Sequence, residues 1–319
     1  MNAVLEVREL RKVYGNTVAL DGVSFDVGPG EVHSIVGPNG AGKTTLMEIA
    51  SGLLSPSGGS VRLFGVDPLR ERRTVTPRLS VAPQFGSLFE RLTIRESVAL
   101  WSTLYASPVD IDDVVARVGL AQLAGRRVHH LSGGEARRLL LALVLVARTE
   151  AVLLDEPTTG LDPQGRADLW AEIAGLRANG TTVILSTHLL EEAERLSDVV
   201  HVICGGRMLA TGTVPDLVRH HGGRGRVRFS SKLDSAADVR RALGLGADTS
   251  VSVASVNSHG SRVSVETDES DRLSRRVLTS RELEARDVTV EHGGLEDVFF
   301  ALTGRRDLEL ASAPERGGD

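Results

Sequence analysis

One segment, Gly37–Thr45, constrains the possible folds of this chain more than any other part of its sequence. It fits the pattern G-x-x-x-x-G-K-[ST] and directly follows the short apolar run Val32–Val36. Glycines let the backbone curl so that its N–H groups point inward, and a following helix adds the positive end of its dipole. The pattern therefore predicts a strand, a phosphate-binding loop and a helix that begins at Lys43.

Each residue type in this loop suits a triphosphate. The lysine side chain reaches the β- and γ-phosphates, and the hydroxyl of Thr44 ligates Mg²⁺. The alternative is an ordinary glycine-rich turn, which the flanking strand and helix disfavour. The candidate nucleotide-binding residues of the loop are Gly37, Pro38, Asn39, Gly40, Ala41, Gly42, Lys43, Thr44 and Thr45.

A second candidate element is the run Ala151–Glu156, in which four apolar residues precede two carboxylates. Such a run is typical of a buried central strand, and ligands of open α/β sheets bind at the carboxyl ends of the strands. Asp155 is expected to hold the Mg²⁺ shell, and Glu156 is expected to polarise the attacking water. The alternative for two adjacent acids is a solvated turn, which the neighbouring phosphate loop disfavours.

Strand and helix patterns alternate along the chain as far as Leu185, which predicts a mostly parallel, buried sheet. The expected strands are Val4–Val13, Ala19–Val27, Val32–Val36, Ser60–Phe64, Ser80–Ala82, Ala151–Leu154 and Thr182–Leu185. The expected helices are the one that begins at Lys43 and those over Ile94–Ala106, Asp110–Val118, Gly134–Ala147 and Gln164–Ala178.

The pattern changes near residue 222, where His220–Gly225 is expected to form a linker. Beyond it the expected order is β-α-β-β-α-β, which is ferredoxin-like. Its expected elements are the strands Arg226–Phe229, Val251–Val256, Arg262–Glu266 and Val288–Glu291 and the helices Ser235–Leu243, Asp271–Ala285 and, last, Leu295–Leu302. We therefore expect a first domain over residues 1–222, a small accessory α+β domain over 223–305 and a disordered tail over 306–319.

Composition excludes several classes of function. The 319-residue chain has a net charge of −5 and only 3% aromatic residues, which argues against a nucleic-acid partner. The single cysteine, Cys204, favours a reducing compartment, the cytoplasm. No apolar run approaches the ~18 residues of a membrane-spanning helix. If the protein works at a membrane, another chain is expected to supply the pore.

The motif Leu131–Glu135, Leu-Ser-Gly-Gly-Glu, resembles the signature of the ABC ATPase family and lies shortly before the Asp155–Glu156 strand, as in that family. Further residues, in the order that the family shows, resemble its other elements. They are Tyr14 for the aromatic that stacks on adenine, Val18 for the apolar contact that follows it, Gln84 for the Q-loop glutamine, Gly160–Asp162 for the D-loop and His188 for the switch histidine. The resemblance covers roughly residues 3–220.

This resemblance implies an α/β fold, a P-loop NTPase of ABC type with a mixed sheet core, an antiparallel β subdomain and a helical subdomain. It implies ATP hydrolysis with ATP and Mg²⁺, in which Glu156, His188 and Gln84 are catalytic. Thr44, Gln84 and Asp155 would lie at the metal, and Asp162 would contact the nucleotide. Family members bind two ATP molecules between head-to-tail subunits, so a second ATPase subunit, identical to the first, is expected as a partner.

Ser132 and two glycines open the helix of the signature motif, so its N–H groups could bind an anion as the Gly37–Thr45 loop does. A second phosphate-binding segment in one chain has little use unless it binds the nucleotide of another molecule. The residues expected to act in trans are therefore Ser132, Gly133, Gly134 and Glu135. The alternative, a plain helix start in which Ser132 and Glu135 form a capping box, is compatible with that role. The commonest signature ends in glutamine. A glutamate at this position could repel a triphosphate unless it points along the helix or pairs with Arg138.

Two further segments, Leu88–Thr93 and Gly294–Gly304, resemble the ABC-2 type exporters, which include antibiotic and multidrug efflux ATPases. The resemblance implies export through a separate transmembrane permease and a position on the inner face of the membrane. The alternative for the second segment is a terminal helix that only docks through Val298, Phe299 and Leu302, and both interpretations can hold at once. The other classes left open are an importer subunit and a soluble ABC ATPase in translation or DNA repair.

Overall fold

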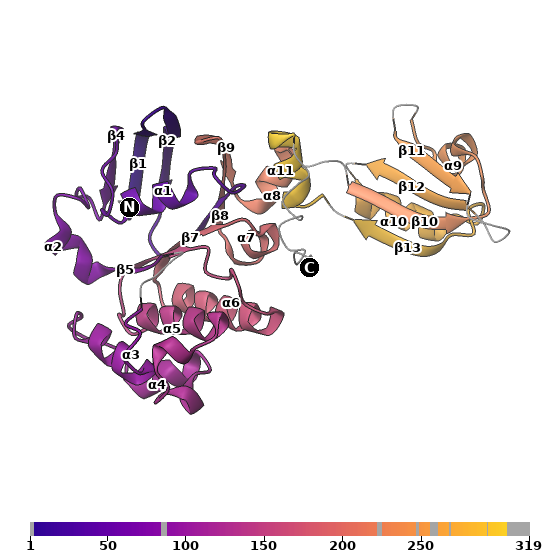
Figure 1. Ribbon diagram of the computed structural model, residues 1–319. Helices are drawn as coiled ribbons and strands as arrows, with labels where there is room; N and C mark the ends of the chain where they lie inside the picture. Colours follow the sequence, from indigo (N-terminus) through magenta and orange to yellow (C-terminus); the bar gives the residue numbers. More distant parts are fainter. Residues whose placement is uncertain are drawn as a thin grey trace, which may run out of the picture. The chain divides into compact units, whose positions relative to one another are not determined.

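The computed structural model describes residues 3–83, 88–221, 225–246, 249–255, 261–267, 269–291 and 293–304. These residues form two compact units, of which the first ends at Val214 and the second begins at Pro215. In Figure 1 the first unit contains two sheets with helices around them, and the second contains one sheet flanked by helices.

A six-stranded mixed sheet forms the centre of the first unit. Its strand order is β5-β6-β7-β3-β8-β9, and all neighbours are parallel except β9, which runs antiparallel to β8. Every residue of β3, β6 and β7 is buried, as expected for parallel strands covered on both faces. The bounds are β3 (Val32–Val36), β5 (Leu79–Ala82), β6 (Ala151–Asp155), β7 (Thr182–Thr187), β8 (Val199–Cys204) and β9 (Arg207–Gly212).

A three-stranded antiparallel sheet, of order β2-β1-β4, forms a subdomain of its own in the same unit. Its strands are β1 (Leu5–Tyr14), β2 (Thr17–Val27) and β4 (Gly58–Leu63). The helices of the first unit are α1 (Lys43–Ala50), α2 (Arg72–Val75), α3 (Ile94–Ser102), α4 (Ile111–Arg117), α5 (Gly133–Leu145), α6 (Pro163–Ala178) and α7 (Leu190–Leu196). No helix within the described ranges of the chain combines the length and the apolar character needed to cross a membrane.

The central sheet separates two hydrophobic cores, because successive side chains of a strand point to opposite faces. In β6, Leu153 packs into the core that includes residues of α1 and of the antiparallel sheet. Its neighbours Val152 and Leu154 pack into the core that includes residues of α3, α4, α5 and α6. Helices on both faces of the sheet thus pack against one strand, which ends at Asp155, directly before Glu156.

The second unit has the predicted β-α-β-β-α-β order, and its sheet has the antiparallel order β11-β12-β10-β13. Val227 and Phe229 of β10 face a core that they share with Val239 and Leu273, whereas Arg228 between them is only half-buried. This confirms the ferredoxin-like prediction. The bounds are α8 (Val214–His221), β10 (Gly225–Ser231), α9 (Ala236–Leu243), β11 (Val251–Ser255), β12 (Ser261–Thr267), α10 (Ser270–Thr279), β13 (Arg286–Glu291) and α11 (Leu295–Thr303).

Two expected helices are shorter in the structure. The helix expected over Asp271–Ala285 ends at Thr279, because Ser280 adopts an extended conformation and the turn after it carries Leu283 into the core. The helix expected over Ile94–Ala106 ends at Ser102, beyond which the chain continues in turns.

The bounds expected for the linker, His220–Gly225, are also wrong at both ends. Helix α8 continues through His221, and strand β10 already begins at Gly225. The paired histidines therefore belong to a helix, whose last turn is a favourable position for basic side chains because of the helix dipole.

Two buried histidines join β3 to the antiparallel edge of the central sheet. His33 Nδ1 lies 2.9 Å from His201 Nε2, and His33 Nε2 lies 2.8 Å from Oε2 of Glu31. His201 Nδ1 lies 3.1 Å from the hydroxyl of Thr211 on β9. Burial, together with the neighbouring His33, lowers the pKa of His201 to about 3. This histidine is therefore neutral in the folded protein at pH 7.

We predict that this neutral histidine makes the fold less stable in acid. An unfolded histidine has a pKa of about 6.5, so below that pH the unfolded chain binds a proton that folded His201 excludes. The free energy of unfolding should therefore be highest above pH 6.5 and should fall by roughly 1.4 kcal/mol per pH unit as the pH drops toward 5. His201→Gln should flatten this slope in urea titrations at several pH values.

The control is His130→Gln, since His130 is exposed and should leave the slope unchanged. An equally steep slope in the His201→Gln protein would contradict the assignment.

Candidate functional site

The loop between β3 and α1 needs glycine at two positions for steric reasons. A Cβ atom on Gly37 would lie 2.3 Å from the carbonyl oxygen of Ile203. Gly42 has φ of 102°, and a Cβ atom there would lie 2.4 Å from the carbonyl oxygen of Ala19. Any side chain at Gly37 or Gly42 would clash with these carbonyl oxygens, so only glycine lets the loop take the shape that binds a phosphate.

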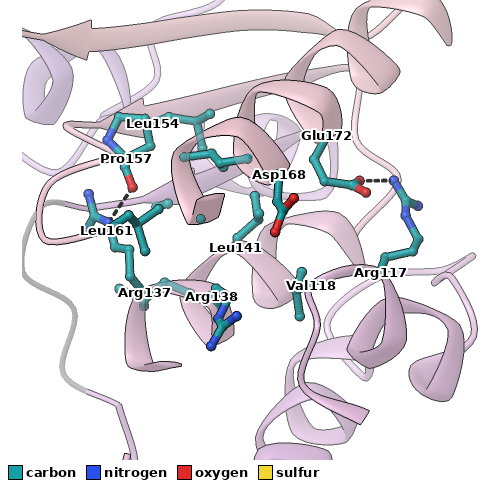
Figure 2. Close-up of a pocket in the computed structure, with 14 residues that line it drawn as sticks. Arg117, Val118, Arg137, Arg138, Leu141, Leu154, Pro157, Leu161, Asp168 and Glu172 are labelled. Carbon is teal, nitrogen blue, oxygen red and sulfur yellow. Dashed lines mark hydrogen bonds and ion pairs between the residues drawn. The ribbon is translucent and has the colours of Figure 1, made fainter. Parts of the chain in front are cut away.

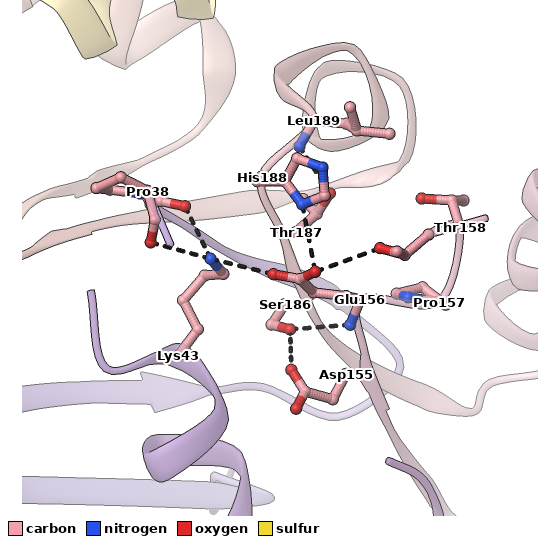
Figure 3. Close-up of polar contacts among 12 residues, drawn as sticks. Pro38, Lys43, Asp155, Glu156, Pro157, Thr158, Ser186, Thr187, His188 and Leu189 are labelled. Atoms are coloured by element: carbon pink, nitrogen blue, oxygen red, sulfur yellow. Dashed lines mark hydrogen bonds and ion pairs between the residues drawn. The ribbon is translucent and has the colours of Figure 1, made fainter. Parts of the chain in front are cut away.

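The ammonium group of Lys43 is held at this loop. Its Nζ donates to the carbonyl oxygens of Gly37 at 2.9 Å and Pro38 at 3.2 Å, and lies 3.3 Å from Oε1 of Glu156 (Figure 3). Only 5% of Lys43 is exposed. A buried cation with weak backbone partners is well placed to exchange them for a phosphate.

Strand β7 contributes a serine that organises both acids at the end of β6. The Ser186 hydroxyl donates to Oδ1 of Asp155 and accepts the Glu156 N–H at 3.0 Å. The same N–H also donates to the Ser186 carbonyl at 3.1 Å. Ser186 is fully buried, so these contacts are shielded from water. They hold the first residue beyond the strand, Glu156, in a left-handed conformation with φ of 46°.

The Glu156 carboxylate lies among polar groups from three other segments. Its Oε2 accepts the Thr159 hydroxyl at 3.2 Å and lies 3.3 Å from Nδ1 of His188, while Oε1 faces Lys43. The His188 contact is an electrostatic one, because among the described residues Nδ1 of this ring has no hydrogen-bond partner. His188 first and Lys43 second lower the pKa of Glu156 to about 2, although burial opposes them.

The Glu156 carboxylate is therefore ionised at neutral pH and forms a charge pair with the Lys43 ammonium. Lys43 lies beyond β3, Glu156 beyond β6 and His188 beyond β7, so the carboxyl ends of three adjacent strands meet here. Ligands of α/β sheets bind at such an edge. The arrangement offers a cation for a phosphate and an ionised base for a water molecule.

The oxygen donors present here suit Mg²⁺. Thr44 lies in the first turn of α1 and Asp155 at the end of β6. Within the described ranges no group of three or more His, Cys, Asp or Glu side chains could hold a metal ion. Mg²⁺ commonly binds through one or two protein oxygens together with substrate phosphates, so the residues fit a site that a nucleotide completes.

The signature segment begins α5 as a capping box. The Ser132 hydroxyl accepts the Glu135 N–H at 3.3 Å, and Oε2 of Glu135 accepts the Ser132 N–H at 2.7 Å. Oε1 of Glu135 pairs with Arg126 at 3.1 Å, so the partner is not the expected Arg138. The Glu135 carboxylate points back to the start of the helix. The hydrogen bond from the Ser132 N–H lowers the pKa of this carboxylate.

Ser132 and Gly133 are exposed, and among the described residues no hydrogen bond joins them to the phosphate loop of the same chain. The structure thus brings Lys43, Asp155, Glu156 and His188 together, whereas the Ser132–Glu135 segment makes no such contact.

The remaining predicted residues have separate places. Tyr14 and Val18 flank the β1–β2 turn and are 46% and 41% exposed, so their side chains are available for a planar ligand. The Asp162 carboxylate caps α6 by accepting the Gly165 N–H at 2.8 Å, which is the ordinary structural role for this residue type. Gln84 lies outside the described residues.

One arginine of the site was not identified from the sequence. Arg137 of α5 is half-buried and donates to the carbonyls of Asp155, Glu156 and Pro157. In the sequence, only the position of Arg137 two residues beyond the signature motif hints at a role in the site. Helix periodicity does not reveal that the Arg137 side of α5 contacts the end of β6.

The fold and this charge pair define a P-loop NTPase. A family model described as ABC transporter matches residues 20–159. Daunorubicin resistance ATP-binding protein DrrA3 of Streptomyces coeruleorubidus is 37% identical over 323 residues, which cover 97% of this chain and 99% of the relative. Nod factor export ATP-binding protein I of Paraburkholderia xenovorans (strain LB400) is 39% identical over 221 residues, which cover 68% of this chain and 73% of the relative.

A solved ATP-binding subunit of an ABC transporter aligns with a TM-score of 0.63 and 28% identity over 68% of this chain and 92% of that one. The chain therefore belongs to the ATP-binding subunits of ABC transporters. As a member of this family it is an ATPase.

We predict that Glu135→Gln changes little. Glutamine at the third helical position can also complete a capping box, so only the exposed Arg126 pair is lost, which is worth about 0.2–1 kcal/mol. Unfolding in urea should show a loss within that range, and the ATPase rate should change by less than about threefold. Ser132→Ala, which removes the cap, should cost about 1 kcal/mol. A complete loss of ATPase in Glu135→Gln would show that the carboxylate has a catalytic role.

Proposed function

We propose that this chain binds ATP with Mg²⁺ at the Gly37–Thr45 loop and uses hydrolysis to power export of a drug, antibiotic or lipid-like substrate through a separate membrane permease. The observation that carries the catalytic part is the meeting of Lys43, Glu156 and His188 within 3.3 Å contacts at the carboxyl ends of β3, β6 and β7.

The proposed chemistry assigns a role to each of these groups. Lys43 exchanges its two carbonyl partners for the β- and γ-phosphates, because a charged acceptor binds an ammonium more strongly than a carbonyl does. The release of Lys43 frees one oxygen of Glu156, which then accepts a proton from the attacking water. His188 contacts the γ-phosphate, and Gln84 is assigned to the same water and metal.

Thr44 and Asp155 would hold the magnesium ion, which supplies positive charge against the triphosphate. Asp155 is oriented for this by Ser186, which binds one of its two carboxylate oxygens and leaves the other for the metal shell. Tyr14 and Val18 would contact the adenine, for which their exposure is suitable.

We further propose a head-to-tail homodimer in which the Ser132 helix start meets the partner's ATP. The exposed Ser132 and Gly133 at the N-terminus of α5 support this, because helix N-termini bind anions. The pair with Arg126 offsets part of the negative charge of Glu135, which reduces its repulsion of a phosphate. Asp162 would contribute from the D-loop.

Export is favoured over import because the relative matched over 97% of this chain is a daunorubicin resistance protein and another is a Nod factor exporter. The partner would then be a transmembrane permease, and the chain would lie in the cytoplasm against the inner face of the membrane. A soluble role in translation or DNA repair finds no support in these relatives. Co-purification tests this: a hydrophobic permease supports export, while a ribosome or DNA-end complex would refute it.

We predict that Lys43→Ala lowers ATP turnover by at least ~100-fold, because removing a charged group that stabilises a transferring phosphate has an effect of that size. The measurement is phosphate release by the full chain with ATP and Mg²⁺. Lys232→Ala, an exposed lysine of the second unit, is the matched control and should retain the wild-type rate. Normal turnover by Lys43→Ala would overturn the proposed site.

We also predict that Glu156→Gln slows turnover by ~10²–10⁴-fold, as expected for loss of a general base, while ATP binding persists. The variant should therefore accumulate as an ATP-bound dimer, detected by light scattering after size-exclusion chromatography. Glu150→Gln alters the acid at the other end of β6 and should neither slow turnover nor trap a dimer. A Glu156→Gln protein with the normal rate would exclude Glu156 as the base.

A further inference from the structure

Arg137 lies against the backbone that leaves β6. Its Nε donates to the carbonyl oxygen of Pro157 at 2.8 Å, and one amino group donates to the carbonyls of Asp155 at 2.8 Å and of Glu156. Its other amino group donates to the carbonyl of Pro83 at 3.4 Å. Figure 2 shows Arg137 pointing from α5 to the turn that holds Pro157. One guanidinium thus binds three successive carbonyls, including that of Glu156.

Burying the charged guanidinium of Arg137 costs free energy unless hydrogen-bond acceptors and negative charges surround it. Burial lowers the pKa of Arg137, while the negative charges of Asp155, Glu156 and Glu192 raise it, and an arginine remains charged in any case. Its planar, forked donors can serve several carbonyls at fixed angles, which a lysine cannot do.

The bound backbone is the part that sets the direction of the Glu156 carboxylate. Glu156 has the left-handed φ of 46°, which a residue with a side chain keeps only when its surroundings impose it. On one side its N–H is bound by Ser186, and on the other its carbonyl is bound by Arg137. Both peptide groups that flank the Glu156 side chain are therefore restrained.

We propose that Arg137 is a positioning residue that ties the signature helix to the loop carrying Glu156 and so holds this carboxylate in place for hydrolysis. The inference rests on the proposed function, in which Glu156 is the base. Ser132 begins the same helix five residues earlier. The helix that would meet the partner's ATP is thus joined by one side chain to the base of its own site.

The test is the steady-state ATPase activity of the full-length Arg137→Ala protein. Its kcat should fall ~30-fold, which corresponds to about 2 kcal/mol in the barrier. Its KM for ATP should stay within about threefold of the wild-type value, because the phosphate loop and Tyr14 are unchanged. Arg137→Lys should restore less than half of the lost activity, since one ammonium cannot replace the fork.

Chemical rescue separates positioning from general stability. Millimolar guanidinium chloride should raise the kcat of Arg137→Ala several-fold by occupying the vacated position beside the cavity that Arg137 lines, whereas equal ammonium chloride should not. The control is Arg117→Ala, which removes an ion pair to Glu172 between α4 and α6 without touching the β6 loop (Figure 2). It should keep the wild-type kcat and show no rescue.

Three results would overturn the inference: a wild-type kcat in Arg137→Ala, an equal kcat loss in Arg117→Ala, or a loss that guanidinium leaves unchanged while the melting temperature falls. Failure of the wild-type protein to hydrolyse ATP, or full activity in Glu156→Gln, would instead refute the proposed function itself.

Discussion

The contact between the Lys43 ammonium and the Glu156 carboxylate, 3.3 Å apart and both almost fully buried, depends on the whole central sheet. Lys43 follows β3 and Glu156 follows β6, and β7 lies between these two strands. Only parallel strands in this order can deliver both residues to one edge. The two cores on either side of β6 supply the burial that keeps the strands in register. The site is therefore a consequence of the sheet order.

One backbone conformation at the site is unfavourable in isolation, and neighbouring segments maintain it. Glu156 takes a left-handed conformation between Ser186 and Arg137. For a residue with a side chain this conformation costs ~1–3 kcal/mol, and such residues cluster where function needs them. The groups that hold Glu156 come from β7 and α5, so the base is oriented by two layers of the fold at once.

The electrostatics follow from the same geometry. Burial alone would raise the pKa of Glu156, but His188 and Lys43 lie close enough to keep it near 2. Glu192 shows the opposite outcome: it is completely buried, its carboxylate accepts hydrogen bonds from Thr158 and Trp170, and burial raises its pKa. The two buried acids thus differ because nearby groups outweigh burial at Glu156, whereas burial outweighs the nearby donors at Glu192.

The sequence by itself determined the local features: the glycine loop ahead of Lys43, the apolar run before Asp155, and the β-α-β-β-α-β order of the second unit. Each follows from short-range sterics or from the side-chain period of a strand or helix. It misplaced the end of α10 and the start of β10, because core contacts such as that of Leu283 decide where such elements stop. Only the tertiary structure decided that Ser186 joins the two acids, that Glu135 pairs with Arg126, and that Arg137 binds the Glu156 backbone. These contacts join residues far apart in the chain, so they exist only once the sheet order has brought their elements together.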